Sequence, residues 1–129
     1  MIDLASIYFD KAEESLAGAE SELGNRRYNN CANRCYYACF QAAISALLQA
    51  GVHATSDWGH EFVQAQFVGQ LINLRKLYAS DLRDVLSRTL YLRLVADYKT
   101  EQVSQTQIAR ALRNTRRFLE AIQKGGETV

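Results

Sequence analysis

Apolar residues recur with a helical period from the start of the chain. Between residues 5 and 23 they are separated by four, three, four, three and four positions, a spacing that places them on one face of an α-helix. This stripe consists of Ala5, Phe9, Ala12, Leu16, Ala19 and Leu23. Gly24 follows directly, and we expect it to form the C-terminal cap of this first helix.

The segment 28–50 carries apolar residues on nearly every side, so it predicts the most buried helix. Its alanines and cysteines would let neighbouring helices approach closely. Gly51 predicts its end, and a loop over 52–60 follows. A third helix is expected over about 60–78, with the stripe Val63, Phe67, Leu71, Leu74 and Tyr78.

Ser80 predicts the N-cap of a fourth helix that ends near Tyr98, with Asp81 and Asp84 in its first turn. Its apolar positions are Leu82, Val85, Leu86, Leu90 and Val95. A fifth helix begins with a capping box, in which Ser104 and Gln107 are three residues apart. Val103 and Ile108 predict a hydrophobic staple across this cap, and the stripe then continues through Ala111, Leu112, Thr115, Phe118, Leu119 and Ile122.

The pattern predicts an all-α bundle whose neighbouring helices are antiparallel and joined by short loops. Proline is absent and no alternating β-branched run is present, so nothing indicates strands. A chain of 129 residues suits one domain. We therefore expect a single helical domain over 1–124 and a flexible tail over 125–129.

Composition places the chain among ordinary globular proteins, with 48% apolar residues, 22% charged residues and a net charge of +1. No run of 18 apolar residues and no signal-peptide pattern is present, so we expect a cytoplasmic protein without membrane contact. Acidic residues gather in 1–25 and basic residues in 110–124, where the arginines are Arg110, Arg113, Arg116 and Arg117. Either the two helices are complementary neighbours or the last helix presents a basic face to a polyanion.

Three cysteines, Cys31, Cys35 and Cys39, recur every four residues. Without a CxxC pair or a nearby histidine, they indicate small interior groups rather than a metal site. Phosphate-loop, dinucleotide, hydrolase and zinc-protease motifs are absent, so we expect no cofactor and no metal. The two histidines, His53 and His60, flank the predicted loop.

The stretch "RLVADY" contains the strongest candidate for function. Arg93 and Asp97 are four residues apart, so one helical face carries both and an ion pair is expected. Such a pair would fix the orientation of a planar guanidinium, as binding of two phosphate oxygens requires. Arg34 lies in the most apolar helix and must find a partner or a ligand. Tyr36, Tyr37 and Tyr98 complete the set of candidates.

Residues 11–48, "KAEESLAGAESELGNRRYNNCANRCYYACFQAAISALL", resemble the opening half of HEPN domains (higher eukaryotes and prokaryotes nucleotide-binding). The matching positions are Tyr28, Ala32, Arg34, Tyr36, Tyr37, Ala38, Phe40, Ala43, Ala46, Leu47 and Leu48. "RLVADY" resembles the later "RxxxDY" of a subfamily with small stand-alone prokaryotic members. The resemblance spans about residues 4–123. It implies a five-helix domain with an up-and-down four-helix core and a tendency to homodimerise.

Many HEPN proteins are RNA endonucleases with an Arg-x4-6-His motif, and others act beside a small nucleotidyltransferase as a toxin–antitoxin pair. Arg93 matches the motif arginine, but Tyr98 stands at the position of the histidine. Tyrosine is a poor general base because its phenol keeps its proton near neutral pH. This departure favours a HEPN protein that binds without catalysing a reaction.

The resemblance and the residues together predict a homodimer that binds a nucleotide or RNA phosphate, a partner nucleotidyltransferase, or both, in a toxin–antitoxin or defence setting. The ligand or dimer cleft would contain Arg93, Asp97, Tyr98, Arg34 and Tyr37. One alternative is a metal-independent endoribonuclease, in which Arg93 stabilises the phosphate and His60 or Tyr98 replaces the missing base. The other alternative is a purely structural helical interaction protein.

Overall fold

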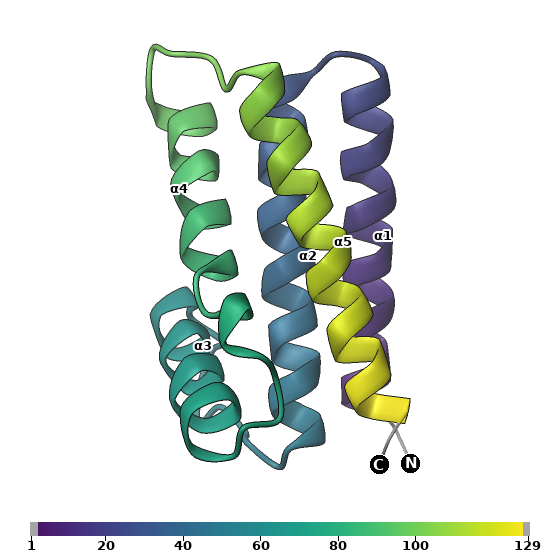
Figure 1. Ribbon diagram of the computed structural model, residues 1–129, viewed down its shortest axis with the longest axis vertical. Coiled ribbons are helices and arrows are strands. Elements are labelled where there is room, and N and C mark those ends of the chain that lie inside the picture. Colours follow the sequence, from purple (N-terminus) through teal and green to yellow (C-terminus); the bar gives the residue numbers. More distant parts are fainter. Residues whose placement is uncertain (1–2, 128–129) are drawn as a thin grey trace.

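The computed structural model describes residues 3–127, which form five α-helices and no strand (Figure 1). The helices are α1 (Leu4–Gly24), α2 (Tyr28–Gln49), α3 (His60–Gln66), α4 (Val85–Tyr98) and α5 (Gln105–Glu127). The predicted all-α bundle with an up-and-down core is confirmed. Along α1, α2, α4 and α5 the chain alternates in direction (Figure 1).

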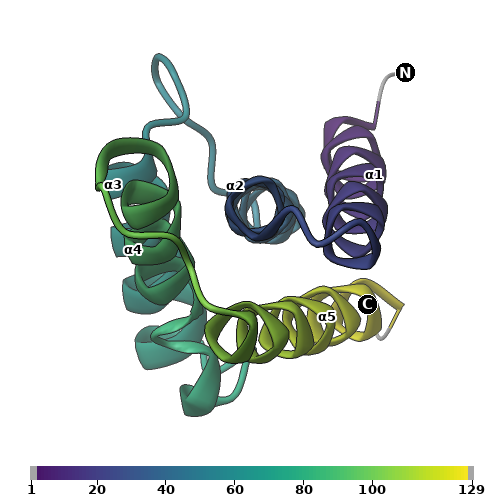
Figure 2. The ribbon, with the colours of Figure 1, turned by 90° about the horizontal axis from the view of Figure 1, so that it is seen from above.

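Helix α2 lies at the centre of the bundle, with α1, α4 and α5 on three of its sides (Figure 2). On its fourth side, opposite α5, no helix of the described part of the chain covers it (Figure 2). We call this surface the open side of α2. It consists of half-buried residues at helical spacing, namely Asn33, Arg34, Tyr37, Phe40 and Gln41.

Small side chains bring the other helices close to α2. Its buried residues include five alanines, which are Ala32, Ala38, Ala42, Ala43 and Ala46. The three cysteines are also buried, as predicted. Cys39 approaches α5, where its Sγ lies 3.5 Å from the Oγ1 of buried Thr115. Close packing against these small groups makes α2 the most buried helix, in agreement with the sequence.

The ends of α1 and α2 share one hydrogen-bond pattern but place different residues in the left-handed conformation. After α2, Gly51 has φ +83°, as predicted, and its N–H donates to the carbonyl of Leu48. After α1, the prediction that Gly24 forms the cap is wrong. Gly24 is still part of helix α1, and Asn25 is its C-cap. Arg26 takes the left-handed conformation, with φ 61°.

The predicted continuous helix over 60–78 is wrong. Helix α3 ends at Gln66 and widens into a π-helix over Phe67–Leu74, after which Lys76 reverses the chain with φ 54°. The wider turn keeps Phe67 and Leu71 buried but leaves Leu74 69% exposed. Tyr78 lies beyond the helix and stacks on Phe67, with 5.5 Å between ring centroids.

The start of α4 and the end of α5 also differ from the prediction. Ser80 makes no side-chain cap, because Ser80–Leu82 is a separate 3-10 turn and α4 begins at Val85. Residues 125–127 continue α5, so the predicted tail is wrong for them, and residues 128–129 lie outside the described part of the chain. The capping box of α5 is confirmed: the Gln107 N–H donates to Ser104 Oγ at 3.1 Å, and the Ser104 N–H donates to Gln107 Oε1 at 3.0 Å.

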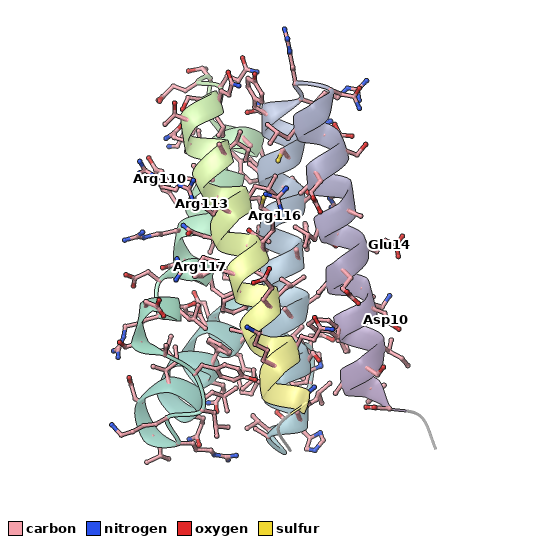
Figure 3. The ribbon with its side chains drawn as sticks, turned by 45° about the vertical axis from the view of Figure 1, so that its right-hand side comes forward. Asp10, Glu14, Arg110, Arg113, Arg116 and Arg117 are labelled. Atoms are coloured by element: carbon pink, nitrogen blue, oxygen red, sulfur yellow. The ribbon has the colours of Figure 1, made fainter. Side chains whose placement is uncertain are left out.

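The acidic and basic helices meet at one ion pair, where Arg116 lies 2.9 Å from Glu20. Asp10 and Glu14 point away from α5 (Figure 3). Arg110, Arg113 and Arg117 lie on the side of α5 remote from α1 (Figure 3). Among the described side chains, the ion pairs between α1 and α5 are therefore limited to this contact. Within residues 3–127, no helix has the length and apolar character needed to cross a lipid bilayer.

Candidate functional site

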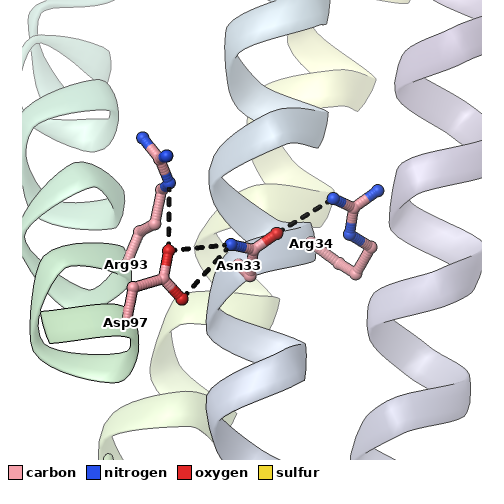
Figure 4. Close-up of polar contacts among 4 residues, drawn as sticks. All are labelled: Asn33, Arg34, Arg93 and Asp97. Atoms are coloured by element: carbon pink, nitrogen blue, oxygen red, sulfur yellow. Dashed lines mark hydrogen bonds and ion pairs between the residues drawn. The ribbon is translucent and has the colours of Figure 1, made fainter.

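Arg93 and Asp97 lie at the open side of α2, where α4 approaches it (Figure 4). The Arg93 Nε is 3.4 Å from Asp97 Oδ2, so the predicted ion pair is present. From α2, Asn33 Nδ2 donates to the same carboxylate, at 3.1 Å to Oδ2. Arg34 Nη2 in turn donates to Asn33 Oδ1 at 2.9 Å. One chain of polar contacts therefore links both predicted arginines.

Two tyrosine rings also hold the Arg93 guanidinium. Its central carbon lies 5.4 Å from the ring centroid of Tyr36 and 5.3 Å from that of Tyr37. Cations at this distance are attracted by the electron-rich ring face. The Arg93 side chain is only 22% exposed, so the guanidinium is partly desolvated against these rings and Asp97. Asp97 and the two tyrosine rings therefore fix the orientation of the guanidinium together.

The N–H groups of this guanidinium lack hydrogen-bond partners among residues 3–127. Its Nε is buried and, although close to Asp97, makes no hydrogen bond of acceptable geometry. The two terminal nitrogens point away from Asp97 (Figure 4). They form no hydrogen bond or ion pair with residues 3–127. These N–H groups are available to an anion that reaches the open side of α2.

Arg34 lies beside the same face of α2 and contacts both Asn33 and Tyr37. Its guanidinium lies over Tyr37, 5.0 Å from the ring centroid. Its aliphatic stem crosses α1 at Gly18, where an added Cβ would lie 3.4 Å from the Arg34 Cδ. A shallow cavity of about 240 Å³ opens here and is lined by Gly18, Glu22, Asn30, Asn33, Arg34 and Asp97. Arg34 thus supplies a second cation near Arg93.

The structure therefore brings together four of the five predicted site residues, namely Arg93, Asp97, Arg34 and Tyr37. Tyr98 is apart from them. It is 71% exposed and makes no hydrogen bond or ring contact within the described residues. One position beyond Asp97, its side chain is rotated by roughly 100° around α4.

Sequence reasoning missed Asn33, although it is the link between the two arginines. Asn33 lies four residues before Tyr37 and so shares its helical face, which is the signal that could have identified it. Its role depends on Asp97, 64 positions away, and that proximity is set by the packing of α4 against α2.

The Tyr36 phenol beneath Arg93 is held in its protonated form. Burial raises the pKa of Tyr36 to about 12, although the nearby Arg93 lowers it. Burial also raises the pKa of Cys39 to about 12, so this thiol stays protonated at neutral pH. A hydrogen bond with Cys35 and burial raise the pKa of Cys31. Among the described residues, no three histidine, cysteine or acidic side chains are grouped to hold a metal ion.

The architecture and this cluster define a class of protein: an all-α domain built around one central helix, with an oriented arginine on the side that no other helix covers. The model of the HEPN domain family matches residues 5–125, so the chain belongs to the HEPN domain family. No curated protein matches the chain.

Proposed function

We propose that this HEPN protein is a non-catalytic module that binds a nucleotide or RNA phosphate at Arg93. The observation that carries the proposal is the guanidinium itself, which is held by Asp97 and two tyrosine rings while its terminal nitrogens have no partner in the described residues. A preoriented planar fork matches two phosphate oxygens and loses little conformational entropy on binding. Arg34 adds a second positive charge on the same face.

Two copies of the chain would meet on the open side of α2. This side carries half-buried aromatic side chains, Tyr37 and Phe40, which a second copy can cover. Leu94 of α4 is 40% exposed and offers further apolar surface to a second copy. A two-fold axis here would bring two copies of Arg93 to one cleft, so both could contact the same polyanion. A nucleotidyltransferase is the protein partner that we propose for this homodimer, in a toxin–antitoxin or defence setting.

Binding of a fluorescent single-stranded RNA and of a fluorescent ATP analogue, followed by polarisation, tests the phosphate site. We expect Arg93→Ala to weaken binding at least tenfold, since a charge-assisted contact contributes about 1.5–3 kcal/mol. Arg113→Ala is the matched control, because this substitution removes the same charge from an exposed arginine of α5 that lies on another face (Figure 3). It should change binding less than twofold.

Three results would count against the proposal. Absence of binding by the unaltered protein at low salt would remove it. Equal losses in Arg93→Ala and Arg113→Ala would indicate a diffuse basic surface, with the basic face of α5 as its centre. Binding that is insensitive to salt would exclude a phosphate contact of any kind.

The endoribonuclease alternative retains one structural argument. His60, which begins α3, lines a small cavity with Tyr36, the ring that Arg93 covers. Incubation of the pure protein with total RNA and a chelator tests this reading. RNA cleavage that disappears in both Arg93→Ala and His60→Ala would overturn the non-catalytic part of the proposal.

A further inference from the structure

Helices α4 and α5 diverge along their length, and a groove lies between them (Figure 1). Its volume of about 590 Å³ is in the range that ligand sites occupy, and the 3-10 turn Ser80–Leu82 borders it. Although Arg93 is part of α4, it does not line this groove. The groove is therefore separate from the proposed phosphate site.

The floor of the groove is apolar. Leu82, Val85 and Ala111 line it, and all three are buried. Thr89 also belongs to the lining, but its hydroxyl already donates to the carbonyl of Val85 at 2.8 Å. Tyr91 borders the groove with a ring that is 62% exposed and makes no contact with another ring in residues 3–127. An apolar side chain can therefore bind on the floor, where Tyr91 can cover it.

The sides of the groove carry more positive than negative charge. Arg117 lies 3.0 Å from Asp81, and Arg88 lies 3.8 Å from Asp84, so these four charges form two ion pairs. Arg110 also lines the groove, but it forms no ion pair or hydrogen bond within the described part of the chain. The groove therefore has one uncompensated positive charge.

Two more side chains of α5 add to this character. Arg113 is exposed on the same side of the helix as Arg110 and has no ion pair among the described residues (Figure 3). Asn114 lines the groove and is half-buried, and its side-chain amide makes no hydrogen bond within residues 3–127. A side-chain amide has a donor and an acceptor, so Asn114 can pair with the N–H and C=O groups of a peptide backbone.

We propose that this groove binds a segment of a partner protein that is rich in acidic residues and carries a large apolar side chain. The apolar side chain packs on the floor beneath Tyr91, and an acidic side chain of the segment pairs with Arg110. Asn114 forms hydrogen bonds with the backbone of the segment. This inference goes beyond the proposed phosphate site and does not depend on it.

The same groove is less suited to a strand of nucleic acid. Such a strand carries a phosphate at every position, so part of it would meet the carboxylates of Asp81 and Asp84. An acidic peptide can place uncharged residues at these two positions. The apolar floor also favours a peptide, because a sugar–phosphate backbone has no apolar side chain to bury there.

Selection of random peptides displayed on phage, with the intact protein as the target, tests the proposal. We expect enrichment of peptides that combine Asp or Glu with Leu, Phe or Trp. Polarisation of the fluorescein-labelled synthetic peptides then measures affinity. Arg110→Glu should weaken binding by at least about tenfold and Asn114→Ala by about fivefold. Lys11→Glu is the control, because it reverses an exposed charge on α1, across α2 from α4 (Figure 2). It should change affinity by less than about twofold.

Four results would overturn the proposal. The first is a selection that enriches no peptide, or only peptides without acidic residues. The second is equal affinity of the selected peptides for Arg110→Glu and the unaltered protein. The third is a tenfold loss in Arg93→Ala, which would place the peptides at the phosphate site. The fourth is single-stranded RNA that displaces the peptides and itself fails to bind Arg110→Glu, which would assign the groove to nucleic acid. Loss of RNA binding in Arg93→Ala with unchanged peptide affinity would support two separate sites.

Discussion

Removal of either partner of the Arg93–Asp97 pair should destabilise the protein by a predictable amount. The side chains are 22% and 30% exposed, and the closest charged atoms are 3.4 Å apart. At this distance the attraction is about 1.2 kcal/mol in a water-like dielectric and about 5 kcal/mol at an effective dielectric of 20. Desolvation of both groups opposes the larger figure. We therefore expect a net coupling of about 1–1.5 kcal/mol, above that of a fully exposed pair.

A double-mutant cycle measures this coupling directly. Asp97→Asn keeps the shape of the side chain but removes its charge, and Arg93→Met keeps most of the aliphatic stem. Urea unfolding of the unaltered protein, both single variants and the double variant gives four free energies of unfolding. The sum of the two single losses should exceed the loss in the double variant by about 1–1.5 kcal/mol. High salt should reduce this difference only in part, because most of the pair is shielded from water.

The same double-mutant cycle can also contradict the proposed role of Asp97. A coupling below about 0.3 kcal/mol, within the usual error of additivity, would mean that Asp97 does not hold the guanidinium. Arg93 would then owe its orientation to Tyr36 and Tyr37 alone. The guanidinium would then lack one of the two contacts that orient it toward a phosphate.

Three further predictions concern the fold. Gly51→Ala should lower the free energy of unfolding by about 1–2 kcal/mol in chemical denaturation, because φ +83° strains any residue with a Cβ. Gly59→Ala is the control and should change the free energy of unfolding little, since Gly59 has no positive φ and an added Cβ there would meet open space. Phe118→Ala should cost about 3–5 kcal/mol in the same assay, since this fully buried ring packs 5.2 Å from Phe67; a loss below 1 kcal/mol would contradict the packing. Burial raises the pKa of Cys39 from 9.0 to about 12, so between these values the unfolded chain loses a thiol proton that the folded chain keeps, and stability should fall as pH rises through this window. Cys39→Ala should make the fall shallower by up to about 1.4 kcal/mol per pH unit, and an unchanged slope would show that this thiol is not protected.

The sequence alone determined those features that depend on residues within about four positions of one another. The stripe of α5 and its cap at Ser104 and Gln107 follow from this short range, because a helix brings such residues together wherever it lies. The Arg93–Asp97 pair was predictable for the same reason. Tyr98 shows the limit of this reasoning. It is adjacent in the sequence, yet the helical rotation turns it away from the site.

Only the tertiary structure decided which helices face one another, and with them the rest of the site. Asn33 joins Asp97 across 64 positions because α4 packs beside α2. The Arg93 guanidinium lies over the ring of Tyr36, which also lines a cavity with His60, for the same reason. The π-helix at Phe67 and the stacking of Tyr78 on that ring are likewise visible only in the folded structure. Such contacts leave no periodic trace in the chain, since their strength depends on what the fold places opposite each side chain rather than on spacing along it.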